Sequence, residues 1–133
     1  MTTTNITRKH RLLFICLGNI CRSPAAEGVM KAKVHAANLD EQFFIDSAGI
    51  GNWHAGQLPD SRMRERGARR GYRLDSRARQ IRQTDFDDFD LLLVMDHENY
   101  RTVTSKAPDE EARKKVRLLT DYLQEAISTT RST

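Results

Sequence analysis

Four short apolar stretches are spaced along the chain, separated by longer segments in which polar residues predominate. They are RLLFIC at residues 11–16, FFIDSAG at 43–49, FDLLLVMD at 89–96 and KVRLL at 115–119. Short apolar runs are typical of buried strands, and apolar residues at consecutive positions indicate burial on both faces. We therefore predict four strands, with residues 89–96 in the centre of a sheet.

Helical periodicity follows the first strand. Ser23 and Pro24 mark the start of a helix over residues 24–38, because a proline at the first helical position loses no hydrogen bond. Spacings of three and four residues give this helix one apolar face. That face comprises Ala26, Val29, Met30, Val34 and Ala37.

Two further helices are expected. One begins after Asp60 and runs over residues 61–70, and the other is capped by Asp96 and runs over residues 97–106. A short extended piece is expected at ARQI, residues 78–81. This order of strands and helices predicts an α/β fold, a doubly wound, four-stranded parallel sheet with helices on both faces.

Length and composition indicate one globular domain. The 133 residues suit a single core, and 38% are apolar while 30% are charged. No apolar run is long enough to span a membrane. Residues 1–10 lack the apolar centre of a secretory signal, so we expect a cytoplasmic protein with no membrane partner. Residues 1–10 and about 124–133 are expected to be flexible.

Positive charge is concentrated in one segment. Nine arginines occur from Arg62 to Arg82, against two acidic residues, Glu65 and Asp75. Two interpretations remain open, a solvated helix face or a basic rim that concentrates anionic substrates. Aromatic residues do not alternate with these arginines, so no nucleic acid partner is expected.

A possible catalytic loop lies between the first strand and the first helix. Cys16 and Arg22 are separated by five residues at the carboxyl end of the strand, the edge where parallel sheets bind ligands. Loop N–H groups and the helix N-terminus would favour a bound oxyanion and the Cys16 thiolate, and Arg22 would hold two oxygens of the anion. The expected phosphate-binding residues are Leu17, Gly18, Asn19, Ile20, Cys21, Arg22 and Ser23. The Asn19 side chain would also brace the loop.

The segment CLGNICRSPAAE, residues 16–27, resembles the phosphate-binding loop of the low-molecular-weight protein tyrosine phosphatases. The likeness continues in DSAGIGNWHAGQLPD (46–60), SRARQI (76–81) and DFDDFDLLLVMDHEN (85–99). The resemblance implies a four-stranded parallel sheet without a metal or organic cofactor. It also implies hydrolysis of phosphotyrosine in protein substrates through a phosphocysteine intermediate, with inorganic phosphate as product and inhibitor.

The resemblance implies roles for individual residues. Cys16 would be the nucleophile and Arg22 the phosphate clamp, while Ser23 and Ser47 would support the thiolate or its loop. Trp53 would form one wall of the slot for the aromatic ring. Separately, the loop brings Cys21 near Cys16, so we expect a reversible disulfide under oxidising conditions.

The chain departs from the family pattern near its C-terminal end. The family's general acid is an aspartate in an Asp-Pro loop after the last strand, and no Asp-Pro pair occurs in these 133 residues. Asp121 lies too close to the last strand to be matched with that acid. The general acid is therefore unassigned, and we expect impaired catalysis. The final helix also has no counterpart, which leads us to expect marginal stability or self-association as a homodimer.

Other functions remain open at this point. An oxyanion-binding module without turnover would use the same loop. Arsenate reductase would require a further cysteine, but no cysteine follows Cys21. An arginine phosphatase would favour threonine where this loop has Ile20, so Ile20 favours tyrosine.

Overall fold

The structure is a computed structural model that describes residues 9–19 and 21–121. Its four strands form one parallel sheet in the order β2-β1-β3-β4. The strands are β1 (His10–Cys16), β2 (Phe43–Gly49), β3 (Leu91–Val94) and β4 (Val116–Leu118). The predicted sheet is confirmed. Of the segments expected to be flexible, residues 1–8 and 124–133 lie outside the described residues, whereas His10 already belongs to β1.

Helices connect the strands. They are α2 (Arg22–Ala36), the 3₁₀ turn η1 (Asp40–Gln42), α3 (Ser61–Arg69), α4 (Asp85–Asp88), α5 (His97–Lys106) and α6 (Glu110–Lys114). The predicted cap of α5 is confirmed, because the Asp96 side chain accepts a hydrogen bond from the backbone N–H of Asn99. Asp60, after which the second helix was predicted to begin, caps α3 in the same way by accepting from Met63. The turns α4 and α6 were not predicted. The extended piece at 78–81 pairs with β2 through a single bridge, between Gly49 and Gln80.

The start of α2 differs from the prediction. Arg22 and Ser23 are already helical, so Pro24 occupies the third helical position instead of the first. Proline is still tolerated there, because the first four N–H groups of a helix have no partner within it. The helix also ends at Ala36, so Ala37 is exposed and does not belong to the apolar face.

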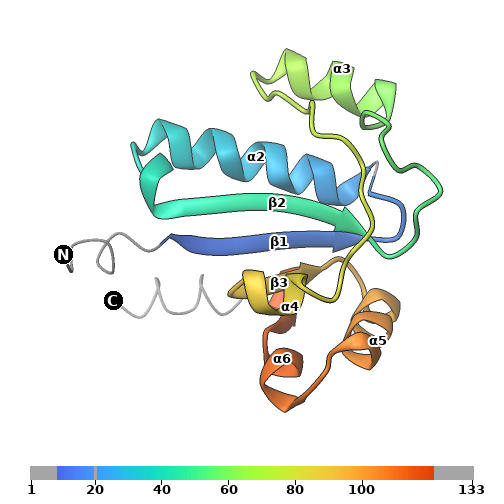
Figure 1. Cartoon of the computed structure of the whole chain (residues 1–133). Coiled ribbons are helices and arrows are strands. Elements are labelled where there is room, and N and C mark those ends of the chain that lie inside the picture. The colour runs from blue at the N-terminus through green and yellow to red at the C-terminus, as the bar shows by residue number, and fades with distance from the viewer. Residues whose placement is uncertain (1–8, 20, 122–133) are drawn as a thin grey trace.

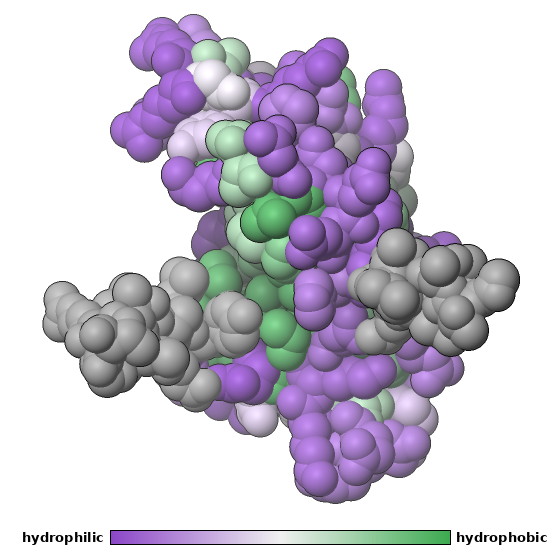
Figure 2. Space-filling view, turned by 90° about the vertical axis from the view of Figure 1, so that its left-hand side faces the viewer, coloured by the Kyte–Doolittle hydropathy of each residue, from purple (hydrophilic) through white to green (hydrophobic). Residues whose placement is uncertain are grey.

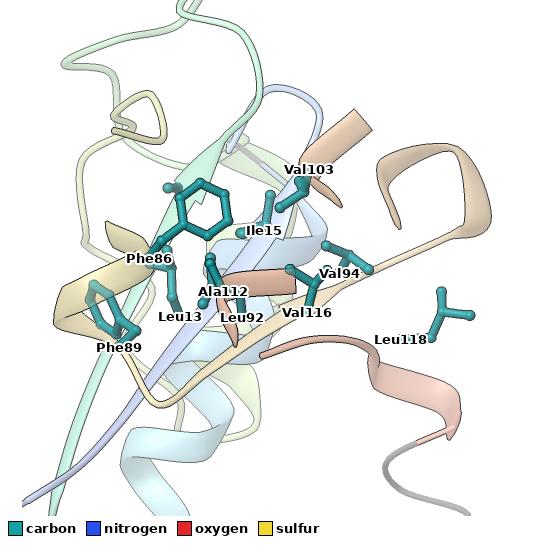
Figure 3. Close-up of a cluster of buried hydrophobic side chains, with 11 residues drawn as sticks. Leu13, Ile15, Phe86, Phe89, Leu92, Val94, Val103, Ala112, Val116 and Leu118 are labelled. Atoms are coloured by element: carbon teal, nitrogen blue, oxygen red, sulfur yellow. The ribbon is translucent and has the colours of Figure 1, made fainter. Parts of the chain in front are cut away.

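Side chains of successive strand residues pack on opposite faces of the sheet. Leu13 and Ile15 belong to a cluster with residues of β3, β4, α4, α5 and α6, shown in Figure 3. Phe14 and Leu93 point to the other face, where they pack with Val34 of α2. Figure 1 shows the result, with α2 on one side of the sheet and α4, α5 and α6 on the other. Helices therefore cover both faces, as predicted.

At the amino ends of the strands, the described residues leave the α2 face of the sheet partly uncovered. A hollow of about 400 Å³ lies there, lined by Leu12, Phe14, Met30, Leu91 and Leu93 among others. Figure 2 shows apolar side chains gathered in a hollow on this side of the molecule. Within the described ranges, no helix is long and apolar enough to cross a membrane.

An ion pair between Arg79 and the buried Asp85 holds the segment 78–85 in place. The Asp85 carboxylate is fully buried and accepts two hydrogen bonds from the guanidinium of Arg79, at 3.0 and 3.2 Å, and one from the backbone N–H of Arg82. Asp46 of β2 accepts a further bond from Arg79. Burial lowers the pKa of Arg79, but the hydrogen bonds and charges of Asp85 and Asp46 outweigh this effect and raise it above its ordinary value.

We expect Asp85→Asn to lower the free energy of unfolding by about 2–3 kcal/mol, because it leaves the half-buried Arg79 cation without its main partner. Asp87→Asn is the matched control, since Asp87 is exposed on the same helix. Urea denaturation followed by circular dichroism measures both changes. Equal stability of the two variants would contradict an anchoring role for Asp85.

Candidate active site

Cys16 is the last residue of β1, and α2 begins at Arg22, six residues further along the chain. The thiol therefore lies at the carboxyl edge of the sheet. There the neighbouring strands β1 and β3 are followed by helices on opposite faces, α2 and α5, which is where doubly wound folds bind ligands. Cys16 is 4% exposed. Ile20, predicted to bind phosphate, lies outside the described residues.

Ser23 is the hydrogen-bond partner of the Cys16 thiol. Its hydroxyl is fully buried in the first turn of α2 and lies 2.9 Å from Cys16 Sγ. The same hydroxyl accepts a hydrogen bond from Asn19 Nδ2, at 2.9 Å. Because that bond uses a lone pair of the hydroxyl, its hydrogen is free to point at the sulfur. This arrangement allows the Ser23 hydroxyl to donate to the sulfur.

Asn19 links the loop to three other parts of the chain. Its backbone is left-handed, with φ at 59°, a conformation that asparagine adopts more readily than most residues. Its buried amide donates to Ser23 and, at 3.0 Å, to Ser47 of β2, and its carbonyl accepts from the backbone N–H of Arg79 at 2.9 Å. The loop, β2 and the anchored segment are therefore held together by one side chain.

The network continues into α2. Ser47 donates to the carboxylate of Glu27, which is 2% exposed, and Lys31 donates to the other oxygen of that carboxylate. Ser23, Glu27 and Lys31 are four residues apart and therefore lie on one face of the helix. Sequence reasoning missed Glu27, although this spacing from Ser23 could have revealed it.

The end of β2 also supports the loop directly. The N–H groups of Ile50 and Gly51 donate to the carbonyls of Cys16 and Leu17, both at 3.0 Å. A Cβ at Gly49 would lie 3.0 Å from the carbonyl carbon of Gly18, so any larger residue at 49 would push the loop.

Arg22 projects from the loop to Asp96, the cap of α5. Its guanidinium donates to the carboxylate at 3.2 Å, and both side chains are about half exposed. The backbone N–H of Asn99 and, secondarily, Arg22 hold the pKa of Asp96 below its ordinary value. Sequence reasoning recognised the cap and missed this contact, which joins residues 74 positions apart.

The remaining candidates are accessible. Leu17 and Trp53 are 53% and 65% exposed, and the indole of Trp53 lies over Gly51, where a Cβ would approach it to 2.0 Å. Cys21 is exposed and Cys16 buried, and both are free thiols in the structure. The structure thus gathers Cys16 with the asparagine and serines predicted to support it.

Comparison with known proteins gives the same family that the loop resembles. The family model described as "Low molecular weight phosphotyrosine protein phosphatase" matches residues 11–131. A low molecular weight protein-tyrosine-phosphatase of Streptomyces coelicolor is 44% identical over 85% of this chain and 69% of its own length. The low molecular weight phosphotyrosine protein phosphatase of Homo sapiens is 40% identical over 84% of this chain and 71% of its own length.

Solved structures share the fold. A protein tyrosine phosphatase from Entamoeba histolytica is 45% identical, with a TM-score of 0.82 over 85% of this chain and 72% of that one. A Drosophila arginine phosphatase is 33% identical, with a TM-score of 0.79 over 85% of this chain and 73% of its own. Taken with the site geometry, these likenesses show that the chain belongs to the low molecular weight phosphotyrosine protein phosphatase family of cysteine-dependent enzymes.

Proposed function

We propose that this chain hydrolyses phosphotyrosine monoesters in proteins, with Cys16 as the nucleophile. The observation that carries the proposal is the contact between Cys16 Sγ and the buried Ser23 hydroxyl at the end of a parallel strand. A sulfur that accepts this hydrogen bond beside a helix N-terminus is stabilised as an anion. An anionic sulfur is the form that attacks phosphorus.

The proposed reaction has two steps. The sulfur attacks phosphorus in line with the bond to the tyrosine oxygen, that bond breaks, and the phosphoryl group is held as a thiophosphate ester on Cys16. Water then attacks the same phosphorus, the sulfur leaves with its electron pair, and inorganic phosphate is released. The Ser23 hydroxyl stabilises the sulfur anion as nucleophile in the first step and as leaving group in the second.

Arg22 binds the phosphoryl oxygens in this proposal. Its fork of donors matches two oxygens of a phosphoryl group and follows their charge through the transition state. Without substrate it pairs with Asp96. Exposed ion pairs of this kind contribute at most about 1 kcal/mol, so phosphate displaces Asp96 at little cost. Asp96 therefore holds Arg22 close to its working position.

Trp53 is proposed to receive the aromatic ring of the substrate. Its indole packs against Gly51 and is 65% exposed. The backbone N–H of Gly51 in turn donates to the carbonyl of the loop residue Leu17. An apolar wall at this place favours an aryl phosphate over an alkyl phosphate.

A second candidate substrate is phosphoarginine, because an arginine phosphatase is among the structural neighbours. The family resemblance places threonine at the position of Ile20 in such enzymes, which favours phosphotyrosine here. Relative turnover of phosphotyrosine and phosphoarginine peptides decides between the two.

Cys16→Ser is expected to lower turnover of p-nitrophenyl phosphate by at least about a thousandfold, because serine is a far weaker nucleophile without a base beside it. Arg22→Lys should also be severe, since an ammonium group cannot reproduce the two-pronged contact. Arg113→Lys makes the same substitution at an exposed position of α6, away from the site, and should leave turnover unchanged. Turnover that survives in Cys16→Ser would show that the chain uses another nucleophile, and no turnover by the parent protein would indicate an oxyanion-binding module.

The rate should fall steeply as the pKa of the leaving group rises. A positioned acid contributes about 10²- to 10⁴-fold by protonating the leaving oxygen, and the 133 residues contain no Asp-Pro pair to supply one. Phosphotyrosine, whose leaving group has a pKa of about 10, should therefore be hydrolysed disproportionately slowly compared with p-nitrophenyl phosphate. The slope of log kcat/KM across a series of aryl phosphates measures this effect. A flat slope in the parent that becomes steep in Asp96→Asn would instead identify Asp96 as the acid.

A further inference from the structure

A groove of about 530 Å³ lies between α2 and the segment that contains α3. Its apolar floor includes Val29 of α2, Met63 of α3 and the buried Leu74, and its rim carries Arg66, Arg69 and Arg70. The floor is closely packed, because Leu74 occupies the space that a Cβ on Gly28 or Gly67 would need. Figure 1 shows α3 on the side of α2 that faces away from the sheet.

The charge of this rim is largely unneutralised. Arg69 pairs with Glu65 at 3.2 Å, but within residues 9–19 and 21–121 neither Arg66 nor Arg70 has an ion-pair partner. No carboxylate is among the groove's described lining residues. Arg66 and Arg70 are both exposed, so their guanidinium groups are available to an anion.

The lining of the groove reaches the first turn of α2, the helix that follows the proposed catalytic loop. Ala25, which lines it, follows Arg22 by three residues in α2, a rise of about 4.5 Å along the helix. An extended peptide advances about 3.3 Å per residue. A peptide bound at the loop through phosphotyrosine would therefore reach Ala25, at the start of the groove's lining, with a residue about two positions from the phosphotyrosine.

We infer that this groove binds acidic side chains that flank the phosphotyrosine in the protein substrate, an inference that rests on the proposed function. Three features support this occupant over a merely solvated helix face. The surface is concave, and Arg66 and Arg70 have no ion-pair partner among the described residues. Its lining also starts in the helix that follows the loop proposed to hold the phosphate. The apolar floor gives a neighbouring apolar side chain of the peptide a place to pack. A nucleic acid is disfavoured because Tyr72 is the one aromatic residue among the described lining residues, and stacking on successive bases needs more.

The test compares two phosphotyrosine peptides that differ only in three flanking residues on each side, glutamate in one and glutamine in the other. The measured quantity is the ratio of their kcat/KM values. We expect the parent protein to prefer the glutamate peptide, with a preference that falls as salt rises. Arg66→Gln combined with Arg70→Gln should reduce the ratio about three- to tenfold. Arg113→Gln, which removes the same charge at α6, should not reduce it.

The outcomes separate this inference from the proposed function. If neither peptide is hydrolysed, the proposed function fails. The groove is then tested by fluorescence anisotropy, which measures the affinity of the labelled glutamate peptide for the parent, the double variant and Arg113→Gln. An equal ratio, or equal peptide affinity, in the parent and the double variant would overturn the inference. So would a double variant that loses affinity for a single-stranded oligonucleotide while its peptide ratio is unchanged, because the surface would then serve a nucleic acid.

Discussion

The hydrogen bonds of the Asn19 side chain are the constraint on which the site depends. Asn19 takes up the left-handed conformation in the loop that follows β1. A buried amide left without partners would cost about 1–3 kcal/mol for each unsatisfied group. Its two donors and its carbonyl are satisfied by Ser23, Ser47 and Arg79, so the left-handed conformation is the one in which the amide is fully paired.

Each partner of Asn19 is itself held in place, two of them through α2 and the third through Asp85 of α4. Ser23 belongs to the first turn of α2, and Ser47 donates to a buried glutamate one turn further along that helix. The Arg79 backbone is positioned because its guanidinium is bound by the buried Asp85 carboxylate. The proposed nucleophile therefore depends on residues from both sides of the sheet.

Local patterns could be predicted from sequence, whereas most long-range polar contacts could not; the family resemblance supplied Ser47 as an exception. The strand at 43–49 and the helix at 97–106 were predicted to the residue, because apolar runs and an aspartate cap are local signals. The spacing of Cys16 and Arg22 likewise identified the loop. The burial of Asp85 was missed, since an acidic segment gives no local sign that an arginine six residues earlier will enclose one carboxylate. The pairing of Arg22 with Asp96 depends on strand order, which brings distant loops to one edge.

The affinity of inorganic phosphate for Asn19→Ala, measured by isothermal titration calorimetry, tests the central claim most directly. Asn38→Ala is the matched control, because Asn38 has nearly the same left-handed backbone, with φ at 60°, but is exposed and remote from the loop. Loss of three buried hydrogen bonds predicts that Asn19→Ala binds phosphate at least about tenfold more weakly than the parent, while Asn38→Ala binds it equally well. Equal phosphate affinity of Asn19→Ala and Asn38→Ala would contradict the account.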